Sequence, residues 1–425
     1  MSESQIIEAD LVWTGTSFER DVRIAVNEDG VIASVGKVDG ATTRRLERKA
    51  LLPGFVNAHS HAFQRGLRGL GETFPKGEGS FWTWREAMYD LVERIDAEII
   101  YELSKQAFSE MLACGITTVG EFHYLHHDQS KAGYTFDEVV LKAAADAGIR
   151  IALLNVFYKT GGIRKPLGRG QDRFATPSLE AYWDQMDMLA ELIDPATQSL
   201  GVVAHSIRAV PLDDLVALHE EACKRGMVFH MHVEEQPQEI EVCIEVYHKP
   251  PMALLNERLE ISPFFTAVHC THTADKDMDE FLASGGNVCI CPLTEANLGD
   301  GLANVPRLLR NDGRICLGTD SNSRLCFTEE MRLLEYGQRL RLQKRGVCVD
   351  GQGNAGTKLL EMATSNGARS LGLKVGKIAK GHHADFATID LDAAALKGWT
   401  ETTLLDTLIL GTGNEAIAET CVGGS

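Results

Sequence analysis

The sequence has a deficit of positive charge and lacks long apolar runs. Of its 425 residues, 42 are Lys or Arg and 60 are Asp or Glu, which gives a formal net charge of −18. A protein that binds a nucleic-acid backbone or an anionic membrane surface needs the opposite balance, because Lys and Arg neutralise phosphates. The first residues contain no basic stretch followed by an apolar run, and no apolar segment is long enough to cross a bilayer. We therefore expect a cytoplasmic protein without nucleic-acid or membrane partners.

Cysteine pairs at CxxC spacing are also absent. The ten cysteines mostly stand singly inside apolar segments, although Cys289 and Cys291 alternate on an expected strand. In a chain of this length without an export signal, such a pattern predicts reduced thiols in the core and argues against a disulfide framework.

The sequence does contain a repeated alternation of short apolar segments with longer helical patterns. Near-continuous apolar strands that alternate with helices are typical of a parallel sheet covered on both faces. Eight such units predict an α/β fold, a (β/α)8 TIM-like barrel over residues 51–374, with active-site residues at the C-terminal ends of the strands. The segments are LLPGFVNAH from Leu51, GITTVGEFH from Gly115, RIALLNVFY from Arg150, LGVVAHS from Leu200, MVFHMHV from Met227, FFTAVHC from Phe264, NVCICPL from Asn287 and RICLGTD from Arg314.

The two ends of the chain have a different character. Residues 5–50 contain short strand patterns with Asp29-Gly30 as a hairpin signal, and a similar pattern follows residue 374. We predict a small β-sandwich domain formed by residues 1–50 and 375–425. The sequence leaves open whether the short C-terminal end completes that domain.

Metal-competent side chains stand at the ends of four predicted strands. His59 and His61 are separated by one residue, and side chains at i and i+2 of an extended strand point to the same side. His232, His269 and Asp320 end three other strands. Each could be a buried structural group that satisfies loop backbone, but their shared position at one face of a barrel predicts a metal centre.

This set of donors indicates hydrolytic chemistry. Two histidines, one further histidine and an aspartate suit Zn²⁺, which lowers the pKa of a coordinated water to about 7. Glu235 follows His232 by three residues, a spacing that can place its carboxyl near a metal-bound nucleophile, where we expect it to protonate a leaving nitrogen. Alternatively, Glu234 and Glu235 are both solvated loop acids.

Several strings identify a family resemblance. Leu52-Pro-Gly-Phe-Val-Asn-Ala-His-Ser-His61, His232, His269 and Gly318-Thr-Asp320 resemble the amidohydrolase superfamily. Within it, the chain from about residue 50 to 375 resembles the N-formimino-L-glutamate deiminases of histidine degradation. That closer likeness rests on HAFQR at 61–65, SFWTWR at 80–85, EFHYLHH at 121–127, TEANLGDG at 294–301 and LEYGQRL at 334–340.

The resemblance implies a function and a set of site residues. It implies zinc-dependent hydrolysis of N-formimino-L-glutamate to N-formyl-L-glutamate and ammonia, by metal-activated hydroxide attack on the formimino carbon. The implied metal ligands are His59, His61, His232 and Asp320, the implied catalytic residues are Glu235, His269 and Asp320, and the implied substrate-binding residues are Gln64, Arg85, Tyr124, His205 and Arg208.

The residues themselves agree with a dianionic substrate. Arg208 follows the fourth apolar segment and Arg85 lies in an aromatic-rich stretch, so both can face the barrel mouth. Planar guanidinium groups bind carboxylates through two hydrogen bonds. No lysine ends the fourth strand, where binuclear relatives carry a carboxylated bridging lysine, so we expect one Zn²⁺ per subunit. We also expect a small-molecule dicarboxylate as substrate and a homodimer.

Two alternatives remain open at this stage. The same barrel could act on a cyclic amidine such as a purine, pyrimidine or triazine, which needs stacking surface rather than paired arginines. Less favoured is a metal-free barrel kept as a structural module, because such a protein would have lost ligands that are all present here.

Overall fold

The computed structural model confirms the α/β barrel fold and describes residues 5–74, 77, 79–130, 133–310 and 314–424. Eight strands form one sheet in the order β13-β12-β11-β10-β9-β8-β7-β6, and the seven pairings between neighbours are parallel. The strands are β6 (Phe55–Ser60), β7 (Ile116–His123), β8 (Arg150–Phe157), β9 (Gln198–Ser206), β10 (Phe229–Val233), β11 (Phe265–His269), β12 (Asn287–Ile290) and β13 (Arg314–Leu317).

The first and last strands of this sheet meet just beyond their ends. Ser60 forms a parallel bridge with Asp320. The backbone N–H groups of Thr319 and Asp320 both donate to the carbonyl of His59 at 3.0 Å, and the N–H of His61 donates to the carbonyl of Asp320 at 2.9 Å. These bonds bring the C-terminal ends of β6 and β13 together at one edge of the barrel.

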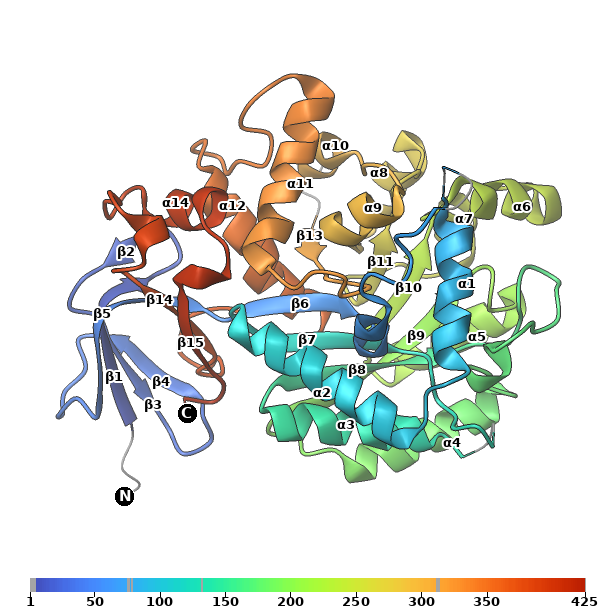
Figure 1. The fold of residues 1–425 in the computed structure, drawn as a ribbon, viewed down its shortest axis with the longest axis horizontal. Helices are drawn as coiled ribbons and strands as arrows, with labels where there is room; N and C mark the ends of the chain where they lie inside the picture. Colours follow the sequence, from blue (N-terminus) through green and yellow to red (C-terminus); the bar gives the residue numbers. More distant parts are fainter. Residues whose placement is uncertain (1–4, 75–76, 78, 131–132, 311–313, 425) are drawn as a thin grey trace.

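Helices surround the barrel (Figure 1). Every residue of β7 and β8 is buried, which explains why these strands are apolar without alternation. The helix after β7, α3 (Thr135–Ala147), ends at Gly148, whose φ of 83° and N–H bond to the carbonyl of Ala144 form a left-handed C-cap. The longer helices are α1 (Phe81–Val92), α2 (Ala97–Ala113), α3 (Thr135–Ala147), α4 (Leu179–Leu192), α5 (Leu212–Lys224), α6 (Pro237–Tyr247), α7 (Pro251–Arg258), α8 (Asp275–Ala283), α11 (Phe327–Leu342) and α14 (Leu404–Gly411).

Shorter helical turns connect these elements. They are η1 (Ala62–Leu67), η2 (Gln171–Arg173), α9 (Pro292–Leu298), α10 (Val305–Arg310), α12 (Ala355–Glu361), the π-helix η3 (Met362–Asn366), α13 (Gly367–Ser370), η4 (Ala394–Leu396) and η5 (Asn414–Ala416).

Strands from both ends of the chain form a second, mixed sheet beside the barrel (Figure 1). Its strands are β1 (Gln5–Trp13), β2 (Phe18–Glu19), β3 (Arg23–Val26), β4 (Ile32–Gly36), β5 (Arg44–Pro53), β14 (Phe386–Asp390) and β15 (Ile417–Cys421). Antiparallel pairing of β14 with β5 joins the two ends of the sequence, and β3 pairs with β4 across the predicted Asp29-Gly30 turn. Residues 1–4 and 425 of the predicted terminal domain lie outside the described residues.

The boundary between the two sheets divides the first apolar segment. Residues 51–53 belong to β5, whereas the barrel strand β6 begins at Phe55. Gly54 stands between them, and a Cβ at this position would lie 2.1 Å from Oγ1 of Thr117. The close approach of the backbone to β7 therefore requires glycine where the chain passes from one sheet to the other.

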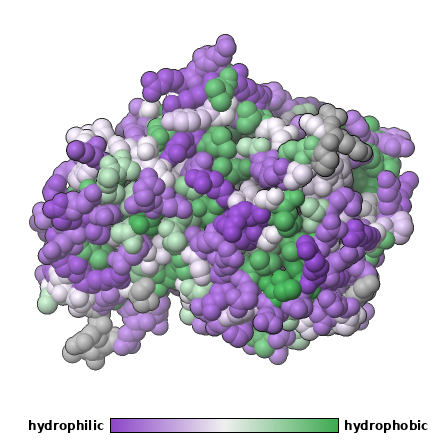
Figure 2. Space-filling model, in the orientation of Figure 1, coloured by the Kyte–Doolittle hydropathy of each residue, from purple (hydrophilic) through white to green (hydrophobic). Residues whose placement is uncertain are grey.

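Side-chain polarity follows this architecture. Polar residues cover much of the face seen in the space-filling view, and apolar side chains show between them (Figure 2). The ten cysteines are free thiols, as predicted, and nine are buried. Among the described residues, no helix is both long and apolar enough to cross a membrane.

Candidate active site

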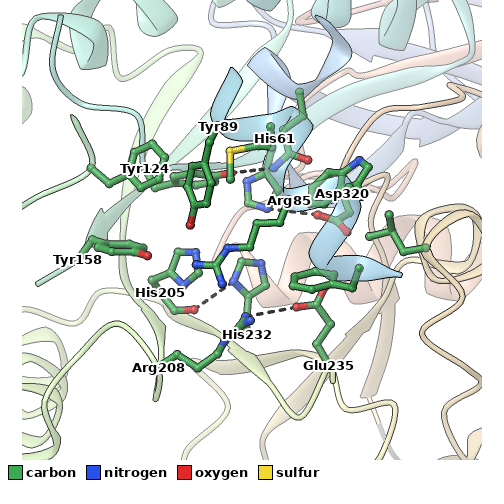
Figure 3. Close-up of a pocket in the computed structure, with 16 residues that line it drawn as sticks. His61, Arg85, Tyr89, Tyr124, Tyr158, His205, Arg208, His232, Glu235 and Asp320 are labelled. Carbon is green, nitrogen blue, oxygen red and sulfur yellow. Dashed lines mark hydrogen bonds and ion pairs between the residues drawn. The ribbon is translucent and has the colours of Figure 1, made fainter. Parts of the chain in front are cut away.

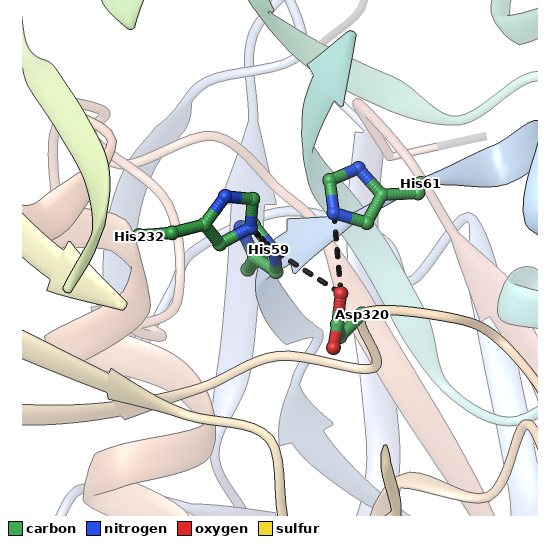
Figure 4. A group of neighbouring side chains, drawn as sticks. All are labelled: His59, His61, His232 and Asp320. Atoms are coloured by element: carbon green, nitrogen blue, oxygen red, sulfur yellow. Dashed lines mark hydrogen bonds and ion pairs between the residues drawn. The ribbon is translucent and has the colours of Figure 1, made fainter. Parts of the chain in front are cut away.

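Four predicted ligands converge at the C-terminal ends of the barrel strands (Figure 4). His59, His61, His232 and Asp320 are all buried, and one ligand atom from each lies within 4.8 Å of the others. The Nε2 atoms of His59 and His61 lie 3.3 and 3.2 Å from Oδ1 of Asp320. Nε2 of His232 lies 3.2 Å from Nε2 of His59.

The orientation of these rings fits a divalent cation. Nδ1 of His61 lies 2.8 Å from the carbonyl of Phe122, and Nδ1 of His232 lies 3.0 Å from the carbonyl of His205. A neutral imidazole has one N–H, so donation to these carbonyls leaves the Nε2 lone pairs facing the centre. Lone pairs and a carboxylate oxygen that face one another without a donor are the ligand set of a zinc-type site.

The charge states of the group also suit a cation. Burial lowers the pKa of His59 to about 3 and holds the pKa of His232 well below its usual range. Burial opposes ionisation of Asp320, but the adjoining His59 and His61 outweigh it and keep the pKa of this carboxyl well below its usual value. Neutral imidazoles beside a carboxylate are the forms that bind metals.

His269 and Glu235 lie next to this group. Nε2 of His269 is 3.8 Å from Oε1 of Glu235, and its Nδ1 is 3.4 Å from Oε1 of Glu295. Burial would lower the pKa of His269, but the negative charge of Glu235 and the hydrogen bond with Glu295 raise it to about 10. The geometry thus places a proton-carrying imidazole and a carboxylate side by side, in reach of the four-ligand group.

An open cavity of about 530 Å³ lies over these residues (Figure 3). All five predicted substrate-binding residues line it, and so do His61, His232, Glu235 and Asp320. Tyr124 follows β7, and Gln64 lies in η1 and donates from Nε2 to the Tyr124 hydroxyl at 2.7 Å. Oε1 of Gln64 is buried and has no hydrogen-bond partner among the described residues, so the cavity wall contains an unsatisfied acceptor.

The two predicted arginines differ in their surroundings. Arg85, on α1, lies 5.5 Å from the ring of Trp82 and 5.4 Å from the ring of Tyr89, and it has no ion-pair partner in the described part of the chain. Arg208 follows β9, and its Nη2 lies 3.3 Å from Oε2 of Glu235. Arg85 is therefore a cation with aromatic neighbours and no paired carboxylate among the described residues, whereas Arg208 is already paired with Glu235.

Several lining residues were not predicted from the sequence. The cavity wall is largely aromatic, and the side chains are Phe81, Trp84, Tyr89, Tyr158 and Phe174. Tyr158 ends the third apolar segment, so its position after a strand was a usable signal. Two carboxylates were also missed: Glu295, which contacts His269, and Glu239, whose Oε2 lies 3.3 Å from Nε of Arg208. Glu295 lies inside the quoted TEANLGDG string.

A second histidine cluster lies outside the cavity. Asp137 of α3 is fully buried, and its carboxylate contacts His123 and His126 at 3.1 and 2.8 Å. It also accepts hydrogen bonds from Asn155 at 2.7 Å and Gln185 at 3.1 Å. Burial opposes ionisation, but His126 and His123 lower the pKa of Asp137 below its usual value. These contacts join α3 and α4 to β7 and β8 and indicate a structural role.

Comparison with known proteins places the chain in a family. The amidohydrolase family model matches residues 50–425. Formimidoylglutamate deiminase of Pseudomonas aeruginosa is 36% identical over 415 residues, which cover 95% of this chain and 90% of that protein. The 5-methylthioadenosine/S-adenosylhomocysteine deaminase of Clostridium tetani is 28% identical, over 91% of this chain and 82% of that protein.

Solved structures show the same relationship. An amidohydrolase from Brucella melitensis has a TM-score of 0.90 and 31% identity, over 99% of this chain and 94% of the other. An adenosine deaminase from Xanthomonas campestris with bound zinc has a TM-score of 0.83 at 23% identity, over 99% and 92% of the two chains, and supports the fold. The chain therefore belongs to the amidohydrolase family of hydrolases and, within that superfamily, to its deaminases.

Proposed function

We propose that this chain hydrolyses N-formimino-L-glutamate to N-formyl-L-glutamate and ammonia, a step of histidine degradation. The observation that carries the proposal is the presence of Arg85 and Arg208 in one cavity with His61, His232 and Asp320. Two guanidinium groups match a substrate with two carboxylates, because each can bind a carboxylate through two hydrogen bonds. The Pseudomonas aeruginosa relative supports the same substrate.

The neutral polar groups of the cavity would hold the formimino end. Gln64, Tyr124 and His205 line the cavity beside the metal-binding group. Burial, with Arg208 and Arg85 nearby, keeps the pKa of His205 well below its usual range, so its imidazole is neutral. The free Oε1 of Gln64 can accept a hydrogen bond from a formimino N–H.

We propose one zinc ion per chain, held by His59, His61, His232 and Asp320. When bound, a zinc ion at such a site acidifies water and polarises the C=N bond of the substrate. The cofactor choice is supported by the nitrogen and oxygen donors and by the carbonyl partners of His61 and His232, which fix the ring orientations.

The remaining residues would move protons. Asp320, beside His269, accepts one proton of the attacking water, and Glu235 delivers protons to the nitrogen that leaves. Both protons that convert this nitrogen to ammonia come from the same water, one through Asp320 and one from the hydroxyl group of the adduct. Water adds to the formimino carbon, the bond from that carbon to its terminal nitrogen breaks, and ammonia departs while a formyl carbonyl remains. Arg208 and His269 hold the Glu235 carboxylate from two sides, at 3.3 and 3.8 Å, and aim it at the cavity.

A second candidate substrate is a cyclic amidine. The aromatic lining of Phe81, Trp84 and Tyr89 offers stacking surface for a ring. The deaminase of Clostridium tetani, named for adenosine derivatives, is consistent with this alternative. A cyclic amidine has no carboxylates for Arg85 and Arg208 to bind, which is why the linear dicarboxylate is preferred.

Ammonia release from a substrate panel tests the proposal. The panel contains N-formimino-L-glutamate, N-formimino-L-aspartate, an uncharged N-formimino amine and adenosine, each with metal-loaded enzyme and with chelator-treated enzyme as control. We expect kcat/KM to be highest for N-formimino-L-glutamate and activity to disappear with the metal. Preference for adenosine, or for the uncharged amine, would reject the dicarboxylate assignment.

Two associated predictions need separate measurements. Metal analysis of the purified chain is expected to give one zinc ion per subunit. Light scattering coupled to gel filtration is expected to give twice the mass of the 46.6 kDa chain, since we propose a homodimer.

A further inference from the structure

A buried carboxylate that the proposed reaction does not use lies behind Arg208. Glu239 of α6 is 2% exposed, and its Oε1 accepts a hydrogen bond from the backbone N–H of Glu234 at 3.2 Å. Its Oε2 lies 3.3 Å from Nε of Arg208, without hydrogen-bond geometry to any described residue. Because Nη2 of the same guanidinium lies 3.3 Å from Glu235, Arg208 stands between two carboxylates.

Arg208 also stands where two cavities meet. The inner cavity contains the predicted active site, and an outer cavity of about 850 Å³ is lined by Glu239, Trp82 and Lys165. Arg85 and Arg208 line both cavities. A ligand carboxylate in the inner cavity therefore approaches a guanidinium whose other edge faces Glu239.

The charges around Arg208 do not balance once such a carboxylate arrives. One guanidinium would then face three carboxylates, and Arg85 would be the other cation of the inner cavity. In a buried site, like charges at this range strongly favour protonation of one carboxylate. Glu235 also faces His269, at 3.8 Å between Oε1 and Nε2, whereas Glu239 has Arg208 as its single ion-pair partner among the described residues.

We propose that Glu239 is a specificity-determining residue that takes up a proton when a substrate carboxylate binds Arg208. The proposal rests on the proposed function, because it assigns Arg208 to a carboxylate of the substrate. In the free enzyme, the Glu239 carboxylate neutralises and orients Arg208. When a dianion binds, its carboxylate takes the place of Glu239 at Arg208, and Glu239 is protonated instead. A ligand without a carboxylate at this position leaves Glu239 unchanged.

The surroundings of Glu239 support this behaviour. Burial raises its pKa to about 7, with Arg208 lowering it and Glu235 raising it further. A bound carboxylate adds negative charge and raises the pKa again. Ligand affinity is therefore full below pH 7 and falls as the pH rises above it, by up to about tenfold per pH unit for one proton.

The titratable and charged groups that face Glu239 are Arg208 after β9, Glu234 and Glu235 after β10, Cys243 on α6, Cys270 after β11, and Arg85 and Lys165 across the outer cavity.

Calorimetric binding of the product N-formyl-L-glutamate to the metal-loaded enzyme tests the proposal without turnover. In buffers of different ionisation enthalpy at pH 8, we expect the wild type to take up close to one proton per ligand. Its Kd should rise about tenfold between pH 8 and pH 9. Glu239→Gln keeps an acceptor for the Glu234 N–H but cannot ionise, so it should bind without proton uptake and with a Kd that does not change over this range. Glu241→Gln, on the exposed side of the same helix, is the matched control and should behave as the wild type does.

The outcomes separate the inference from the proposed function. Binding by the wild type without proton uptake, or uptake that persists in Glu239→Gln, overturns the role of Glu239 and leaves the proposed function intact. Absence of product binding together with absence of ammonia release from N-formimino-L-glutamate overturns both. If Glu239→Gln does not fold, infrared difference spectra of the wild type decide the matter. Ligand binding at pH 8 must then produce a protonated-carboxyl band, and its absence rejects the proposal.

Discussion

Replacement of Arg208 by lysine is the sharpest test of the dicarboxylate assignment. Lysine keeps one positive charge but loses the planar fork that binds a carboxylate with two parallel hydrogen bonds. Removal of the charge would be harder to interpret, since Glu235 and Glu239 would then share a buried site without the cation that lies 3.3 Å from each. The lysine variant therefore tests how the substrate carboxylate is bound while a positive charge remains beside Glu235 and Glu239.

The expected magnitude follows from the contacts that are lost. A hydrogen bond to a charged group contributes about 1.5–3 kcal/mol, and the lysine variant loses one of two such bonds to the ligand. This corresponds to a fall of roughly 13- to 160-fold in kcat/KM for N-formimino-L-glutamate. The lower part of the range is expected, because Arg208 already divides its charge between Glu235 and Glu239 before the substrate arrives.

The assay compares two substrates in one enzyme. Values of kcat/KM are measured for N-formimino-L-glutamate and for an uncharged formimino amine, with zinc content and thermal midpoint recorded for each variant. Arg169→Lys is the matched control, because the Arg169 side chain is 52% exposed, pairs with Asp90 and Glu93, and does not line the cavity. Unchanged kcat/KM for the dicarboxylate, or an equal loss for both substrates, would refute the role of Arg208.

Three other predictions concern the acid, the metal and the buried cluster. Glu235→Gln should lower kcat by about 10²–10⁴-fold with zinc content unchanged, and near-full turnover would contradict its role as the acid. Chelation should abolish ammonia release, added Zn²⁺ should restore it, and His61→Asn should weaken zinc retention in equilibrium dialysis. Asp137→Asn should lower the free energy of unfolding by about 3–5 kcal/mol in urea titrations. Because the pKa of Asp137 is lowered on folding, this difference should be present above about pH 4 and shrink in acid, and a difference that grows in acid would be inconsistent with it.

The barrel strands were predictable because their physical signal is local. A strand buried on both faces must be apolar along its length, as β7 and β8 are, and each such run marks one strand without knowledge of its neighbours. The exception is the first run, where Gly54 divides two sheets. That division depends on how closely the backbone approaches Thr117, which is a contact between distant residues.

In the candidate site, too, the residues could be predicted from the sequence but their contacts could not. The HxH spacing at 59–61 and the strand-end positions of His232, His269 and Asp320 could be read along the chain. The partners of those residues could not, since Asp320 reaches His59 through a bridge between the first and last strands of the barrel. The roles of the five predicted substrate-binding residues stay predictions, although all five line one cavity.

The sequence by itself determined that this chain has eight apolar strand segments, cysteines without CxxC pairs and metal-competent residues at the ends of four strands. Periodicity, residue type and spacing along the backbone carry that information. Only the tertiary structure decided that Arg208 stands between Glu235 and Glu239. It also decided that the rings of His59 and His61 both approach one carboxylate oxygen of Asp320. Such contacts depend on barrel closure and helix placement, which bring together residues as far apart as 59 and 320 and set the charge that each side chain experiences.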